Sequence, residues 1–482
     1  MPILSYGRAI AWHAEREPER VAIWCEGQTR TRAELDRRAN RLARAYAGLG
    51  VGAGDLVTVA LPNGPEFYEA CLATWRLGAT PNPISSRLPL AERRAIVETA
   101  DPALVVGVPG GEYGARPSLA PGFEPAAESD APLPDRTSAC VRAMTSGGST
   151  GRPKVILDAF PAETDPEQAE NGIVPGGATL VAGPLYHAGP FITSWSSLLV
   201  GARAVVMPRF DAERALALID EHAIDWALFV PTMMQRIWRL PAEVRERYDL
   251  SSLARVMCTG APSPAWLKRA WIGWLGGERV FEAYGGTERI AGTVISGTEW
   301  LEHPGSVGRP THGRRIRILD AEGKDCPPGT VGEVYMMPPG GRGSTYRYVG
   351  AEPMATDDGW ETLGDLGYLD EDGYLYLADR KTDMIVTGGA NVYPAEIEGV
   401  LDAHPAVRSS AVIGLPDEDL GQRVHAIVDA PGGVGEEELR SHVAANLVRY
   451  KVPRSFEFVA EPLRDDAGKV RRSALRAERL PS

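Results

Sequence analysis

A loop rich in glycine and hydroxyl side chains is the part of the sequence best suited to bind an anion. The stretch MTSGGSTGRPKVIL, residues 144–157, contains three glycines, four serine or threonine residues and one lysine. Its glycines let backbone N–H groups turn inward as an anion-binding nest, while the hydroxyl groups and the lysine add donors and charge. The expected phosphate contacts are Thr145, Ser146, Gly147, Gly148, Ser149, Thr150, Gly151 and Lys154. A flexible hairpin tip has a similar composition, so the loop alone predicts an anion site and no particular reaction.

The residues on both sides of the loop distinguish it from a kinase-type phosphate loop. A Walker loop reads GxxxxGK[ST], and its lysine opens a helix. Here Pro153 stands between the last glycine and Lys154, and the apolar residues 155–157 that follow are suited to a strand. Residues 140–144 before the loop are suited to a strand as well. We therefore predict that the loop connects two strands.

Short apolar runs and helical periodicity alternate through the first 300 residues, and they predict the elements that must position the loop. Buried strands are expected at residues 20–25, 56–62, 103–108, 178–184, 202–208, 226–231 and 253–260. Helices are expected at residues 31–50, 64–79, 87–100, 191–200, 211–223 and 264–276. Strands that alternate with helices form parallel sheets covered by helices, so the predicted fold class is α/β, with layers of the αβαβα type.

The character of the chain changes after residue 300. Glycine and proline become frequent and short strands replace the helices, which indicates a small β-rich subdomain over about 300–380. Within it, residues 370–374 (DEDGY) are typical of a hairpin turn. Helices and strands then mix again, as in a compact α+β domain. We therefore predict a large N-terminal domain, 1–380, and a small C-terminal domain, 381–482.

Composition and charge exclude several other classes of protein. The chain has 482 residues and a formal net charge of -13, which argues against broad nucleic-acid binding, because that needs a basic surface. The five cysteines are far apart and form no CxxC pair, so we expect reduced thiols and a cytoplasmic location. No run of 18 apolar residues and no signal-peptide pattern occurs, so we expect no membrane span.

Three motifs downstream of the loop give the anion site a specific chemistry. They are AYGGTE at 283–288, ETLGDLGYLDEDGYLYLADRKTD at 361–383 and DDAGKVRR at 465–472. An aromatic face suits a flat base, and a hard carboxylate suits a hard cation that bridges phosphates. With the loop, and in this order over essentially the whole chain, they resemble the adenylate-forming superfamily of acyl-CoA synthetases, nonribosomal adenylation domains and luciferases. The sequence is most similar to its bacterial acyl- and aryl-CoA ligases and stand-alone amide bond synthetases.

The resemblance implies a nucleotide site built from these motifs. Tyr284 would stack on adenine, Thr287 would contact phosphate and Glu288 would help to hold Mg²⁺. Asp365 would bind the ribose hydroxyls, and Arg380 would reach ribose or phosphate. The flanking nucleotide contacts would be Gly260, Ala261, Pro262, Glu282, Ala283 and Gly285.

A mobile C-terminal domain is also implied by the resemblance. Lys469 would bridge the substrate carboxylate and the α-phosphate during adenylation, although a lysine in a basic tail is otherwise simply solvated. The hinge would fall at Thr382, where the family usually has Asp or Lys, and the C-terminal domain would then rotate. Rotation would bring in Gly388 and Gly389 to line a pantetheine tunnel, although two glycines before a strand also suit a tight turn.

The pocket for the acid is expected beside the nucleotide. The element PLYHAGPF resembles the family segment whose histidine lies between acyl pocket and acceptor tunnel, so His187 would gate the pocket or take a proton from the nucleophile. Trp195 would line and shorten the pocket, or belong to the core. The full acyl-pocket set is Tyr186, His187, Trp195, Gly260 and Gly285.

The predicted activity is ATP- and Mg²⁺-dependent activation of a small-molecule carboxylic acid to an acyl-adenylate, with release of pyrophosphate. The catalytic residues would be His187, Thr287, Glu288 and Lys469. Coenzyme A is the expected acceptor of the acyl group, and an amine is the alternative acceptor. A different class of function is a catalytically inactive binding scaffold on the same fold. The intact set of motifs argues against it.

Overall fold

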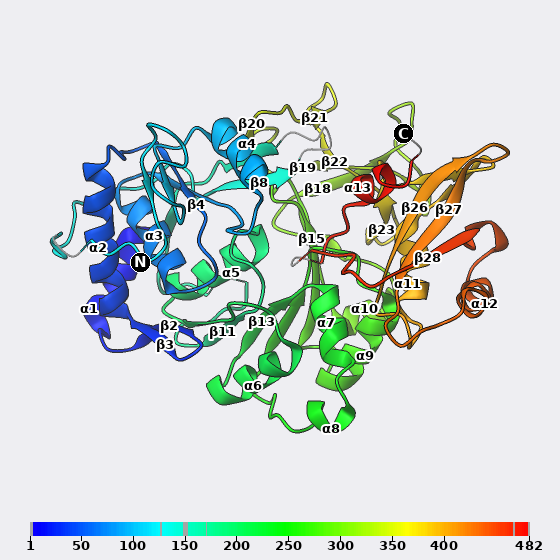
Figure 1. Cartoon of the computed structure of the whole chain (residues 1–482), viewed down its shortest axis with the longest axis horizontal. Coiled ribbons are helices and arrows are strands. Elements are labelled where there is room, and N and C mark those ends of the chain that lie inside the picture. The colour runs from blue at the N-terminus through cyan, green and yellow to red at the C-terminus, as the bar shows by residue number, and fades with distance from the viewer. Residues whose placement is uncertain (1–2, 126–127, 148–152, 170, 466–467, 481–482) are drawn as a thin grey trace.

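The chain extends from N-terminal helices at one end of its long axis to the C-terminal elements at the other (Figure 1). The structure, a computed structural model, describes residues 3–125, 128–147, 153–169, 171–465 and 468–480. Four of the predicted phosphate contacts lie outside these ranges, namely Gly148, Ser149, Thr150 and Gly151. The green strands and helices in the middle of Figure 1 connect the two ends.

The largest sheet in the described part of the chain has nine strands, in the order β17-β16-β15-β14-β13-β11-β12-β2-β3. Its parallel strands are β2 (Val21–Cys25), β11 (Ala178–Val181), β12 (Arg203–Val206), β13 (Trp226–Phe229), β14 (Arg255–Cys258) and β15 (Val280–Gly285). Antiparallel strands form its edges: β3 (Gln28–Thr31), β16 (Gly292–Ser296) and β17 (Arg309–Pro310). Strands such as β11 and β13 are buried along their whole length, as expected of parallel strands covered on both faces. The sheet confirms the α/β class.

A second, parallel sheet packs against the first through a layer of helices. It consists of β5 (Thr80–Pro83), β4 (Leu56–Val59), β6 (Leu104–Val106) and β7 (Ser118–Leu119), in that order. Helices α3 (Pro65–Arg76) and α5 (Ala188–Leu199) share one core cluster with strands of both sheets. Every residue of α3 except Glu66 is buried, as befits a helix between two layers.

The remaining helices of this region cover the sheets from outside. They are α1 (Tyr6–Arg16), α2 (Arg32–Gly48), α4 (Leu90–Ala100), α6 (Ala212–His222), α7 (Pro231–Trp238), α8 (Ala242–Arg245), α9 (Ala265–Leu275) and α10 (Gly297–Glu302). Helix α2 begins with a capping box, in which Thr31 accepts from the Glu34 N–H and Glu34 accepts from the Thr31 N–H. Near the N-terminus, β1 (Leu4–Ser5) pairs with β10 (Glu163–Thr164).

The phosphate loop connects two antiparallel strands, β8 (Ala143–Gly147) and β9 (Pro153–Asp158), as predicted. Strand β20 (Tyr346–Val349) pairs with the other edge of β9. Side chains alternate along β9, so Lys154 and Ile156 share one face, and Tyr348 of β20 stands opposite Ile156. The lysine of the loop therefore lies next to a tyrosine 194 residues further along the chain.

A five-stranded antiparallel sheet follows, as the glycine-rich texture predicts. Its strands are β18 (Arg315–Leu319), β19 (Gly332–Met337), β21 (Met354–Ala355), β22 (Glu361–Leu369) and β23 (Leu375–Arg380). The turn between β22 and β23 is the predicted hairpin, because Leu369 pairs with Leu375. Asp370 closes it by accepting from the N–H groups of Asp372 and Tyr374 at 3.1 and 2.8 Å.

The C-terminal elements have a core cluster of their own, which runs from Ile385 to Phe456. They are β24 (Ile385–Thr387), β25 (Ala390–Val392), α11 (Pro394–Leu401), β26 (Ser409–Asp417), β27 (Gly421–Asp429), α12 (Glu436–Asn446), the 3₁₀ turn Arg449–Lys451, β28 (Ser455–Val459) and α13 (Arg472–Ala477). These elements are orange and red in Figure 1 and lie beside α7, α9 and α10. No helix within the described ranges is long and apolar enough to cross a membrane.

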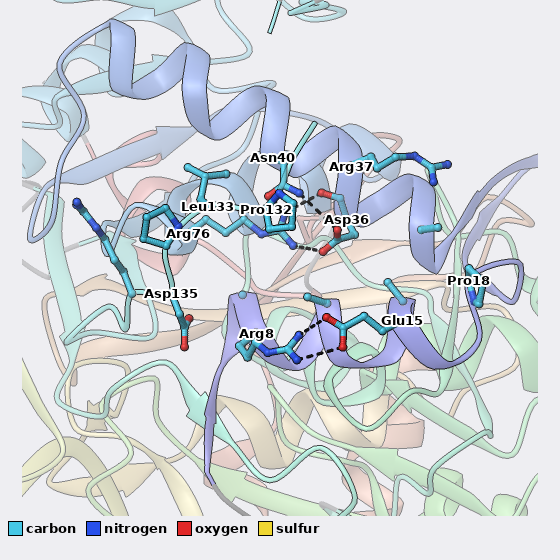
Figure 2. A pocket seen from close by; sticks show the side chains of 16 residues that line it. Arg8, Glu15, Pro18, Asp36, Arg37, Asn40, Arg76, Pro132, Leu133 and Asp135 are labelled. Atoms are coloured by element: carbon cyan, nitrogen blue, oxygen red, sulfur yellow. Dashed lines mark hydrogen bonds and ion pairs between the residues drawn. The ribbon is translucent and has the colours of Figure 1, made fainter. Parts of the chain in front are cut away.

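A cavity of about 600 Å³ between α1, α2 and residues 132–136 is not part of the predicted site (Figure 2). Several of its charged side chains have partners in the lining: Arg8 donates to both carboxylate oxygens of Glu15 at 2.7 and 3.1 Å. Arg76 donates to Asp36 and Asn40. None of the motif residues lines this cavity. The candidate site is therefore located from the place where the sequence motifs come together and not from this cavity.

Candidate active site

The site forms where the central parallel strands end. Strands β13, β14 and β15 are followed by α7, by residues 259–262 and by the connection 286–291, and ligands of α/β sheets bind at such carboxyl ends. The Thr259 hydroxyl donates to the Ala283 carbonyl at 2.8 Å, which ties two of these segments together. The predicted contacts Gly260, Ala261 and Pro262 therefore lie next to the strand that carries Tyr284.

Tyr284, Asp365 and Arg380, which we call the nucleoside group, meet although they come from two distant motifs. Asp365 on β22 and Arg380 on β23 are cross-strand partners, and Arg380 Nε lies 3.5 Å from Asp365 Oδ1. The Tyr284 hydroxyl donates to Asp365 Oδ2 at 2.6 Å. Burial and the neighbouring Asp365 carboxylate raise the pKa of Tyr284 well above its usual value, so the phenol stays a donor. The structure thus assembles one aromatic ring and one carboxylate, as expected for a nucleoside.

Lys154, Glu288 and Tyr348, which we call the phosphate group, form a second cluster. Lys154 Nζ lies 3.3 Å from Glu288 Oε1 and donates to the Tyr348 hydroxyl at 2.8 Å. That hydroxyl donates in turn to Glu288 Oε1 at 2.7 Å, and the Lys154 ammonium lies 4.0 Å from the centre of the Tyr348 ring. Burial, followed by the charge of Glu288, raises the pKa of Tyr348. Tyr348 was not predicted, because only the pairing of β20 with β9 brings it here.

Glu288 fits the role of a magnesium ligand. Its carboxylate is nearly buried and its Oε1 is used by Lys154 and Tyr348, which leaves Oε2 for a cation. A side-chain carbon at Gly286 would collide with Leu363 Cδ1 and stand 2.9 Å from Glu288 Oε2, so the close approach of the chain to this carboxylate requires glycine. Within the described ranges no three His, Cys, Asp or Glu side chains cluster as a metal cage. Magnesium that is held by one carboxylate together with phosphates and water requires no such cage.

Lys469 lies near enough to Arg380 of the nucleoside group and Glu288 of the phosphate group for their charges to act on its ammonium. Its N–H donates to Asp465 Oδ1 at 2.9 Å, and Arg464 donates to the Gly468 carbonyl at 3.3 Å. The Lys469 side chain is exposed to solvent. Partial desolvation and the charge of Arg380 lower its pKa, while Asp465 and Glu288 act in the opposite direction.

Thr145 is anchored by a residue that sequence reasoning missed. Asn82 on β5 is fully buried and donates to the Ala143 carbonyl at 2.7 Å and to the Thr145 hydroxyl oxygen at 3.2 Å. Thr58 donates to the Asn82 side-chain oxygen at 2.8 Å. Because the Thr145 oxygen accepts from Asn82, its own hydrogen is available for an anion. No local sequence pattern identifies Asn82, which acts through a neighbouring sheet.

Tyr186, His187 and Trp195 of the predicted acyl pocket lie before α5 or within it, whereas Gly260 follows β14 and Gly285 ends β15. His187 is the N-cap of α5, half-buried, with its ring 4.4 Å from that of Tyr186. Trp195 is 2% exposed and packs against Trp75 and Tyr68, with ring centres 4.5 and 5.4 Å apart. Of the two roles considered for Trp195, the structure shows core packing, and its pocket role stays a prediction.

Glu282 lies on β15, two residues before Tyr284. Its carboxylate is buried and paired with Lys268 on α9, and its nucleotide contact stays a prediction. Burial raises the pKa of Glu282, and Lys268 opposes the shift. The contacts predicted for its neighbours Ala283 and Gly285 stay predictions as well.

The residues predicted for domain movement follow Arg380 in the chain. Gly388 and Gly389 form a two-residue hairpin turn between β24 and β25, with φ of 55° and 80°, which shows the tight-turn alternative. Thr382 lies between two attachments: Lys381 contacts Glu333 of β19 at 2.8 Å, and Asp383 contacts Arg472 of α13 at 3.0 Å. The hinge and tunnel roles stay predictions.

Comparisons with known proteins agree with this geometry. Residues 10–343 match the family described as AMP-binding enzyme, and residues 396–469 match the AMP-binding enzyme C-terminal domain. The chain is 30% identical over 504 residues to the fatty acid–[acyl-carrier-protein] ligase ScoC of Streptomyces coeruleorubidus, covering 97% of this chain and 95% of that one. It is 32% identical over 486 residues to a feruloyl-CoA synthase of Amycolatopsis sp, covering 96% of each. The amide bond synthetase McbA from Marinactinospora thermotolerans has a TM-score of 0.82 at 27% identity, covering 98% of this chain and 99% of that one.

Fold, site and relatives define an adenylate-forming ligase. The chain belongs to the AMP-binding enzyme family, including its C-terminal domain. The three relatives are named for three different acceptors: a carrier protein, coenzyme A and an amine that becomes an amide. Membership therefore identifies the activation step and leaves the acceptor open.

Proposed function

We propose that this enzyme uses ATP and Mg²⁺ to convert a small carboxylic acid to an acyl-adenylate, and then transfers the acyl group to coenzyme A. The observation that carries the proposal is the meeting of the nucleoside group, the phosphate group and Lys469 at one edge of the central sheet. These residues come from segments more than 300 positions apart, and each has the chemistry that its part of an ATP–acid complex requires.

The first step needs positioning rather than proton transfer. A carboxylate is ionised at neutral pH, so it can attack the α-phosphorus without a general base. It must approach a polyanion, so counter-charge is required, and Lys154 and Lys469 would provide it. Mg²⁺ bound at Glu288 would neutralise the departing pyrophosphate. The protein contributes orientation and fixed charge.

The acceptor step would use the opposite side of the adenylate. We propose that His187 gates the acyl pocket or takes a proton from the incoming nucleophile, since it caps α5 beside Tyr186. We further propose that residues 381–482 rotate about Thr382 and that Gly388 and Gly389 then line the acceptor tunnel. An amine acceptor is the second candidate, and it is favoured by the similarity to McbA. All five cysteines are free, which supports the cytoplasm as the proposed location.

A pyrophosphate-release screen tests the proposal. The wild-type protein, Mg²⁺ and ATP are mixed with aliphatic, aryl and steroidal acids, first alone and then with coenzyme A or a simple amine. We expect acid-dependent pyrophosphate release with one class of acid and, by mass spectrometry, a thioester when coenzyme A is present. An amide in place of the thioester would select the second candidate. Absence of pyrophosphate with every acid would contradict adenylation and favour the inactive scaffold.

A further inference from the structure

Helix α7 touches the C-terminal part of the chain at both of its ends. At its start, Gly468 packs so closely on Thr232 that a side-chain carbon at position 468 would meet the Thr232 hydroxyl at 2.7 Å. At its other end, Gln235 and Arg239 donate to carbonyl oxygens between α11 and β26. In Figure 1, α7 lies at the border between the green sheet region and the orange and red elements.

The contacts of Arg239 are directed at main-chain oxygens. Its guanidinium donates to the carbonyls of Asp402 and Arg408 at 3.1 Å each and also to the carbonyl of Val407. Asp402 is the C-cap of α11, where carbonyls have lost their partners within the helix. The nearly buried amide of Gln235 adds a donor to the Asp402 carbonyl at 3.3 Å. One rigid, planar donor therefore holds three acceptors, which a lysine ammonium on a flexible stem does less well.

The position of Lys469 follows from these two points of contact. Helix α7 has eight residues and is therefore about 12 Å long, a short rigid bar between the Arg239 contacts and Gly468. Gly468 precedes Lys469 directly, so the orientation of the C-terminal part on α7 sets how far the lysine reaches toward Glu288 and Arg380. A shift at the Arg239 end rotates the lysine loop at the other end.

We propose that α7 is the docking surface that holds the C-terminal part in its adenylating position, and that Arg239 is the positioning residue of this surface. The inference rests on the proposed function, since it assigns Arg239 to the first half-reaction alone. Its contacts are hydrogen bonds to carbonyls, so parting the surfaces returns a charged group and peptide oxygens to water. Polar interfaces of this kind between parts of one chain can open and close.

The test compares Arg239→Ala and Arg239→Lys with a matched control, Arg236→Ala, which removes an exposed arginine from the same helix. Acid-dependent exchange of labelled pyrophosphate into ATP, with the best acid of the screen, reports adenylation. Single-turnover transfer from preformed adenylate to the acceptor reports the second step. Amide hydrogen exchange of residues 398–409 and 464–472 reports docking without any acid, with and without Mg²⁺ and ATP.

We expect Arg239→Ala to lower pyrophosphate exchange by about tenfold, because a smaller fraction of molecules is docked. Transfer from preformed adenylate should stay within about twofold, and both peptides should exchange faster. Arg239→Lys should fall between Arg239→Ala and wild type, and Arg236→Ala should match wild type. Unchanged pyrophosphate exchange and unchanged protection in Arg239→Ala would overturn the proposal. Equal loss of both half-reactions would also overturn it, because it would indicate a merely structural role.

The two proposals can fail separately. If no acid supports pyrophosphate exchange in the wild type, the proposed function fails, and hydrogen exchange still decides whether Arg239 holds the surfaces together. If the wild type is active and Arg239→Ala keeps full exchange activity and full protection, the docking proposal fails alone.

Discussion

The nucleoside group and the phosphate group are built on different principles. In the nucleoside group, strand register sets Asp365 opposite Arg380, and Tyr284 donates to the same carboxylate. These contacts orient a ring and a carboxylate that can receive a nucleoside without moving apart. In the phosphate group, Lys154 and Glu288, which we propose for phosphate and metal, are paired with each other. If the proposal holds, ligand binding must change these partners. Asp365 and Arg380 also form an ion pair, but strand register fixes their positions, so we regard the nucleoside group as the preorganised half.

This contrast predicts that substitutions near the phosphates change the rate, whereas substitutions near the nucleoside change the ATP requirement. The largest effect is expected from Lys469→Ala. Loss of one stabilising donor of this kind commonly lowers a rate by about 10²–10³-fold, and we expect that loss in acid-dependent pyrophosphate exchange. The side chain is solvent-open, so thermal unfolding should stay close to wild type. Normal exchange activity in Lys469→Ala would contradict its role.

Glu288→Gln should have the next largest effect. It removes the negative charge that balances Lys154 and that would hold Mg²⁺, and it keeps the volume of the side chain. We expect pyrophosphate exchange to fall by about 10²-fold, with a higher Mg²⁺ concentration needed for half-maximal rate. A Mg²⁺ titration at saturating ATP measures both. Unchanged Mg²⁺ dependence would remove Glu288 from the metal site.

Asp365→Asn tests the preorganised half. The amide keeps one acceptor oxygen and loses the charge, so ribose hydroxyls and the Tyr284 phenol are held less firmly. We expect the KM for ATP to rise by about tenfold and kcat to change by less than about threefold. Initial rates over a range of ATP concentrations separate the two parameters. A fall in kcat as large as that of Glu288→Gln would break the contrast between the two groups.

Of these four substitutions, Tyr348→Phe should have the smallest effect on activity. It tests the difference between the phosphate group and the nucleoside group most directly. The ring that lies under the Lys154 ammonium stays, while the hydroxyl that bridges lysine and carboxylate is lost. We expect the Mg²⁺ requirement to rise by about three- to fivefold, in keeping with one hydrogen bond to a charged group. Asp365→Asn is the matched control, because it should leave the Mg²⁺ requirement unchanged.

Local patterns in the sequence predicted most of the elements and several site residues. The helical periodicity over residues 31–50 and the apolar residues 155–157 after Lys154 correctly indicated a helix and a strand. The signature motifs identified Tyr284, Asp365 and Arg380 because each carries its own chemistry within a few residues. Sequence analysis therefore singled out residues whose motif lies within one short stretch of the chain.

The missed features depend on contacts between distant segments. Tyr348 is placed by the pairing of β20 with β9, and the Lys268–Glu282 pair is formed by a helix packed on a sheet. Helix α1 was not expected either, although Ser5 accepts from the Arg8 N–H as an N-cap. That signal was present in the sequence, whereas the two side-chain pairings become visible only when the sheets are assembled.

The buried path from Thr58 through Asn82 to Thr145 connects the phosphate hairpin to the interior of the second sheet. Thr145 is thus positioned by Asn82 and Thr58, two residues that are fully buried. If Thr145 binds the anion as we propose, part of that binding depends on buried residues outside the loop. Asn82 is consequently a place where a change deep in the second sheet would alter the hold on ATP.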